Sequence, residues 1–97
     1  MCEFKIINQT DNTQLGEEIV VAHYSQNNQL LLKDILGTAI TLESALILEV
    51  NTLNQTLTVV EHPLVKNFVE ILKTLVENKE NSEKINEFQK ALDQVKK

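Results

Sequence analysis

The chain has 97 residues, of which 42% are hydrophobic and 24% are charged, and this predicts one compact globular domain. Its net charge is −5 and it contains no arginine, so it lacks the cationic track that nucleic-acid binding requires. No apolar run is long enough to span a membrane, and the single cysteine excludes an internal disulfide, so we expect a cytoplasmic protein with no membrane partner.

The charge is distributed unevenly along the chain. Through Glu61 there are two lysines and eight acidic residues, which gives this part a net charge of −6. From His62 onward there are seven lysines and six acidic residues, which gives +1. The first part has only Phe4 and Tyr24 as aromatic residues, whereas single-strand binders combine aromatic platforms with cationic grooves. We therefore expect no nucleic-acid partner.

Short strands are predicted for the first two thirds of the chain. These segments are rich in β-branched or large apolar residues, and turn chemistry such as that of Asp11–Gly16 separates most of them. In chain order the predicted strands are Phe4–Ile7, Glu18–Ser25, Leu30–Ile35, Thr38–Leu42, Leu46–Asn51 and Thr56–Glu61. Six short strands at close spacing favour a small barrel or rolled sheet over residues 1–61, because closure removes exposed strand edges.

A helical period begins after this segment. Pro63 suits the first turn of a helix, and the apolar residues of Leu64–Val76 cover an arc much wider than one helix seam needs. The opposite, charged ridge alternates in sign and consists of Lys66, Glu70, Lys73 and Glu77. The helix is therefore predicted to touch two surfaces, such as the barrel and a second helix.

A second helix is predicted after a polar break at Asn78–Glu83. Asn81 or Ser82 is its expected N-cap, and its narrow apolar stripe consists of Ile85, Phe88, Leu92 and Val95. A helical pair over residues 62–97 is the interpretation that we prefer. The alternative is one long helix that runs through the break and pairs with its copy in another subunit.

Cys2 is the main candidate for chemistry. If Met1 is removed, residue 2 carries an α-amine and a thiol, and the two form a five-membered chelate ring that the amide of Glu3 can extend. Such donors suit the square-planar preference of Ni(II) or Cu(II), and a thiolate also attracts Cu(I) and Zn(II). The alternative is a small apolar residue at the chain terminus, which residue chemistry alone favours.

The other polar candidates have weaker patterns. His23 and His62 could support a metal, but no paired-histidine or CxxC spacing is present, so structural or surface roles are favoured. Asp34 precedes a glycine turn and is expected to tie that turn down. Ser25 and Ser44 lack a nucleophile motif. Because no catalytic constellation can be assembled, we expect a protein that is not an enzyme.

Several segments of the sequence carry a family resemblance. The start "MC", followed by "GEEIVVAHY", "LLLKDILGTAI" and "LILEVNTLNQTLTVVE", resembles the CooT family over about Met1 to Glu61. The resemblance implies an SH3-like β-barrel, a homodimer, and nickel delivery to carbon monoxide dehydrogenase. It also implies that Cys2, directly after the initiator methionine, carries the nickel. The tail from His62 to Lys97 has no counterpart in compact members.

The combined interpretation is an α+β protein with two parts. Residues 1–61 form a small SH3-like antiparallel β-barrel, and residues 62–97 form a helical extension that packs on the barrel or on a second subunit. We expect a cytoplasmic, homodimeric accessory protein that binds Ni(II) through Cys2 and serves a nickel-enzyme client. The alternative is an RNA-binding or protein-interaction module in which Cys2 is incidental. A structural subunit of a larger assembly is a third possibility.

Overall fold

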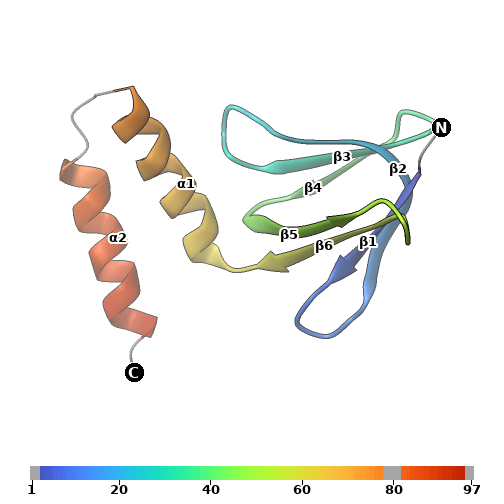
Figure 1. Cartoon of the computed structure of the whole chain (residues 1–97). Coiled ribbons are helices and arrows are strands. Elements are labelled where there is room, and N and C mark those ends of the chain that lie inside the picture. Colours follow the sequence, from blue (N-terminus) through green and yellow to red (C-terminus); the bar gives the residue numbers. More distant parts are fainter. Residues whose placement is uncertain (1–2, 78–81, 96–97) are drawn as a thin grey trace.

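The chain folds into one sheet followed by two helices, an α+β arrangement (Figure 1). The computed structural model describes residues 3–77 and 82–95. The strands are β1 (Phe4–Asn8), β2 (Gln14–Tyr24), β3 (Leu30–Asp34), β4 (Ala39–Leu42), β5 (Ala45–Asn51) and β6 (Thr56–Glu61). The helices are α1 (Pro63–Val76) and α2 (Ser82–Val95). The boundary between sheet and helices therefore falls at His62.

The six strands form a single sheet in the order β4-β3-β2-β1-β6-β5. All neighbouring pairs are antiparallel except β1 and β6, which run parallel with Lys5 opposite Thr56 and Asn8 opposite Val59. The sheet is not closed, so the predicted barrel is not confirmed. The expectation of an antiparallel sheet is wrong for this pair, in which the first and the last strand of the chain are neighbours inside the sheet.

The core lies on one face of the curved sheet. It is formed by aliphatic side chains from five of the six strands, namely Ile6, Ile19, Leu30, Leu32, Ala45, Leu57 and Val59. Alternation along β6 explains why Leu57 and Val59 point inward together. On β5 the same alternation places Ala45 in the core and leaves Leu46 and Leu48 half exposed.

Tyr24 joins two parts of the sheet that no backbone ladder connects. Its hydroxyl donates to the carbonyl of Ala45 at 2.8 Å and accepts from the amide of Ile47 at 3.2 Å. Both partners are on β5, at the far edge of the sheet from β3 and β4. Burial raises the pKa of the Tyr24 hydroxyl above its ordinary value, although the hydrogen bond from Ile47 opposes this. The side chain of Tyr24 is therefore a neutral phenol in the folded structure at neutral pH.

We expect Tyr24→Phe to lower the free energy of unfolding by about 1–2 kcal/mol, because it leaves the partners on β5 unpaired. The folded pKa is raised, so the contribution of the phenol is complete below about pH 10 and is lost as pH rises through the folded value. Urea unfolding at pH 7 and pH 11 measures both effects. The parent should lose more stability than the phenylalanine variant between these pH values, and equal losses would contradict this role of Tyr24.

The start of α1 is fixed to the turn between β4 and β5. The amide of His62 donates to the carbonyl of Ser44 at 3.1 Å, and the hydroxyl of Ser44 donates back to the carbonyl of His62. The same hydroxyl accepts from the amide of Lys66 at 2.9 Å. These bonds satisfy backbone groups of the first helical turn and set the direction in which α1 leaves the sheet.

The second helix packs on the first and runs back along it (Figure 1). The rings of Phe68 and Phe88 have centroids 5.9 Å apart, and Lys84 is 3.0 Å from the carboxylate of Glu70. The prediction of two helices is confirmed. Ser82 is the first residue of α2, whereas Asn81, the other candidate N-cap, lies outside the described residues. Neither described helix has the length and apolarity needed to cross a bilayer.

Candidate functional site

The N-terminal end of the sheet is where the sequence places its candidate site. Cys2 lies outside the described residues, which begin at Glu3. The strand β1 begins at Phe4, which pairs with Ile19, and the amide of Lys5 donates to the carbonyl of Gln55 at 2.9 Å. In the sequence, one residue, Glu3, separates Cys2 from this strand.

An apolar hollow of about 260 Å³ opens beside Phe4. Its walls come from β1, β2, β5 and β6, and they consist of Phe4, Ile19, Val20, Val21, Ala22, Ile47, Val50 and Leu57. Val21 and Val50 are 40% and 57% exposed, so the hollow is open to solvent. None of the described residues in its walls has a metal-ligating side chain. The hollow can take an apolar side chain of another molecule, and it lies at the strand that follows Cys2.

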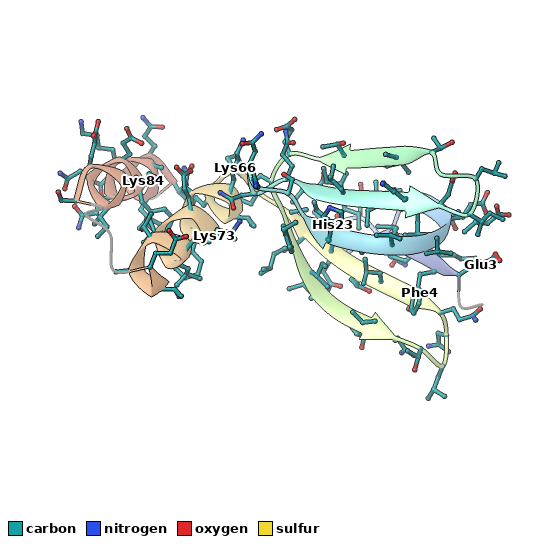
Figure 2. All side chains as sticks on the ribbon, turned by 90° about the horizontal axis from the view of Figure 1, so that it is seen from above. Glu3, Phe4, His23, Lys66, Lys73 and Lys84 are labelled. Carbon is teal, nitrogen blue, oxygen red and sulfur yellow. The ribbon has the colours of Figure 1, made fainter. Side chains whose placement is uncertain are left out.

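His23 is exposed on β2, and the structure does not bring it to the N-terminal end. Phe4 lies opposite Ile19 on β2, and His23 is four residues further along the same strand. At about 3.3 Å per residue this separates His23 from the pairing partner of Phe4 by about 13 Å. Figure 2 shows Glu3 and Phe4 at the end of the sheet that is far from the helices, with His23 closer to the helices.

His62 is the N-cap of α1. Its Nδ1 accepts a hydrogen bond from the amide of Leu64 at 3.1 Å, and its backbone is extended as a cap requires. This nitrogen is therefore occupied in the folded chain, and the residue stands at the helical end of the sheet. Over residues 3–77 and 82–95, no three His, Cys, Asp or Glu side chains gather as a metal cluster would need.

The remaining sequence candidates have structural partners. Asp34 accepts from the amides of Leu36 and Thr38, each at 2.9 Å, which confirms that it ties down the glycine turn. The hydroxyl of Ser25 accepts from the amides of Asn27 and Gln29, each at 3.2 Å. Ser44 holds the start of α1, as described above. These side chains stabilise turns and helix termini.

One feature of the structure was missed in the sequence. A polar groove of about 460 Å³ separates the β2–β3 turn, residues 26–29, from the helices, and Lys66, Lys73 and Lys84 line its helical side (Figure 2). Asn28 is 6% exposed within the turn, and its Oδ1 has no hydrogen-bond partner among the described residues. Its positive φ of 66° is typical of asparagine in tight turns. The turn itself was predictable, but its position across a groove from α1 was not.

Comparison with known proteins gives no family for this chain. No protein-family model matches the sequence, and no curated protein matches it either. The function must therefore be argued from the residues and the fold. The relevant observations are the single thiol at position 2, the strand that begins at Phe4, and the apolar hollow beside it.

Proposed function

We propose that this protein is a metal-binding accessory protein that carries Ni(II) on Cys2 and transfers it to a nickel enzyme. The observation that carries the proposal is the position of the only thiol, two residues before a strand that pairs on both sides.

The donor set at residue 2 suits this metal. Once Met1 is removed, the α-amine and the thiolate of residue 2 offer one nitrogen and one sulfur in a five-membered chelate ring. Ni(II) accepts such mixed donors in a square-planar arrangement, which leaves positions for ligands from another molecule. Open positions favour transfer, because a client ligand can enter before the carrier ligands leave.

The apolar hollow supports a role in docking. Transfer needs the client to approach the thiol, and the hollow beside Phe4 offers apolar area at that end of the sheet. The resemblance to the CooT family in the "MC" start and the strand segments supports the same proposal, with carbon monoxide dehydrogenase as the model for the client. The alternative is a protein-interaction module in which Cys2 has no role, and the hollow is the observation that favours it.

A titration of the native chain with Ni(II) tests the proposal. Thiolate-to-nickel charge-transfer absorption should rise to saturation, and binding should strengthen from about pH 6 to 8, because the amine and thiol have reference pKa values near 8 and 8.5. Iodoacetamide can alkylate only Cys2, the sole cysteine, and should abolish the absorption and the binding. Unchanged binding after complete alkylation, verified by mass spectrometry, would contradict the proposal. The same spectra show whether Met1 is removed.

A further inference from the structure

The polar groove between the β2–β3 turn and the helices has a volume of about 460 Å³, which is within the range of small-molecule sites. One wall is the turn, where residues 26–29 carry four carboxamide side chains. The other wall is helical, and it consists of Lys66, Glu70, Lys73, Thr74, Glu77 and Lys84. A ligand that fits these walls must itself be polar and charged.

The helical wall has an excess of positive charge. Lys66, Lys73 and Lys84 bring three positive charges, whereas Glu70 and Glu77 bring two negative charges, which gives +1 in a chain of net charge −5. Lys84 lies 3.0 Å from Glu70, so this pair is neutral as a unit. The remaining balance of the wall therefore favours an anion.

Lys66 and Lys73 have weak partners among the described residues. The Nζ of Lys66 is 3.8 Å from the carboxylate of Glu43, whose side chain is 70% exposed, so water competes for both groups. The Nζ of Lys73 is 3.5 Å from the carbonyl of Ser25 across the groove, which is longer than an ordinary hydrogen bond. Seven residues separate the two lysines on one face of α1, or about 10.5 Å along its axis, so their long side chains can converge on one group.

Asn28 is a buried polar side chain in the wall of the same groove. It is 6% exposed, and its Oδ1 has no hydrogen-bond partner among the described residues. A buried polar atom without a partner lowers stability, so its presence calls for an explanation such as a missing ligand. Rotation about the last side-chain bond exchanges Oδ1 and Nδ2, so Asn28 can accept from a hydroxyl group or donate to an oxygen.

We infer that this groove binds a small phosphorylated polyol, with the phosphate group between Lys66 and Lys73 and the hydroxyl groups on the β2–β3 turn. A phosphate ester carries nearly two negative charges at neutral pH on a compact set of acceptor oxygens, and lysines bind it as point charges. Hydroxyl groups donate and accept, so they can pair with Asn28 and the other carboxamides of the turn. The inference does not rest on nickel binding by Cys2.

A titration with glycerol 3-phosphate, followed by NMR of the ¹⁵N-labelled full chain at low ionic strength, tests the site. The backbone amides of residues 26–29 and the side-chain amide of Asn28 should shift and saturate. Inorganic phosphate should bind at least about threefold more weakly, because it lacks the polyol hydroxyl groups that pair with the turn. Absence of saturable shifts in the turn, or equal binding of inorganic phosphate, would overturn the inference.

Charge variants test the position of the phosphate group. Lys73→Gln should weaken the binding of glycerol 3-phosphate about tenfold, because a neutral amide replaces an ammonium group. Lys90→Gln makes the same change at an exposed lysine of α2 outside the groove, and it should leave the affinity within about twofold. Glu70→Gln releases Lys84 and removes a negative charge, so it should strengthen binding about threefold. Equal losses in the two lysine variants, or weaker binding by Glu70→Gln, would contradict this position.

A variant of the turn tests the contact with Asn28. Asn28→Gly removes the carboxamide and keeps the turn, because glycine readily adopts the positive φ of 66° at this position. It should weaken the binding of glycerol 3-phosphate at least about threefold, with an unchanged circular dichroism spectrum. Cys2→Ser should leave this affinity unchanged, so the groove and the nickel proposal can fail separately. Parent-like binding by Asn28→Gly would overturn the role of Asn28 in the site.

Discussion

Replacing Cys2 with serine should lower the affinity for Ni(II) at pH 8 by about a hundredfold or more. Serine keeps the amine, the amide and the approximate shape, but it exchanges a soft thiolate for a hydroxyl that stays protonated at this pH. Groups that only orient metal ligands are worth about 10–100-fold in affinity, so a direct ligand should be worth at least as much. Competition with a chelator of known affinity measures the change.

Histidine variants are the matched controls for this prediction. His23→Ala removes an exposed imidazole far from Phe4 along β2, and it should leave the nickel affinity within about twofold. His62→Asn keeps an N-cap side chain for α1 and should behave in the same way. Serine is as small as cysteine, so we expect Met1 to be processed in this variant as it is in the parent. If the histidine variants lose nickel while Cys2→Ser keeps it, the thiol has no part in binding.

Most elements of this fold could be predicted from local patterns. The strand Thr56–Glu61 is as predicted, and α1 has Pro63 in its first turn and ends at Val76, as predicted. The largest error is in β2, which begins at Gln14, within a segment interpreted as a turn because of Gly16. Gly16 lies inside the strand and pairs with Ile6, and a Cβ there would lie 3.0 Å from the side chain of Ile40. This glycine serves a close approach between strands.

The sheet topology could not be derived in the same way. Alternation of apolar residues indicates which residues share a face, but it does not say which strands become neighbours. The parallel contact of β1 with β6 joins segments about 50 residues apart, and the bridge from Tyr24 to β5 depends on how the sheet curves. A closed antiparallel barrel was the simplest way to pair six short strands. The chain instead leaves β4 and β5 as the edges of its sheet.

The role of His62 was partly readable in the sequence. A residue before proline is biased toward extended backbone, and a helix that begins with proline needs a cap at the preceding position. His62 meets both conditions and is the N-cap of α1, whereas in the sequence a structural or surface role was favoured only because no paired-histidine spacing is present. In contrast, the apolar hollow beside Phe4 combines side chains from four strands, so it depends on the sheet order. The interpretation of Cys2 comes from the sequence and remains a prediction.

A second large effect is expected at β1. Ile6→Ala should lower the free energy of unfolding by about 3–4 kcal/mol, because Ile6 is fully buried and its removal leaves a cavity between β2 and β6. A small domain has roughly 5–15 kcal/mol of stability in total, so this is a large share. Urea unfolding followed by circular dichroism measures it. Leu53→Ala, at a position that is 94% exposed, is the matched control and should change stability by less than about 0.5 kcal/mol.

The same variant links stability to the proposed function, because β1 is the strand that follows Cys2. Ile6→Ala removes no metal donor, so nickel affinity should stay within about threefold of the parent wherever the variant remains folded. If nickel binds only the folded chain, saturating nickel should raise the free energy of unfolding of Ile6→Ala and of the parent by similar amounts. The urea midpoints measure this increase. A loss of stability below about 1 kcal/mol would show that Ile6 is not part of the core. Ile6→Ala could also bind nickel more weakly than the parent under conditions in which both are folded. That result would show that the packing of β1, in addition to the thiol, positions the metal.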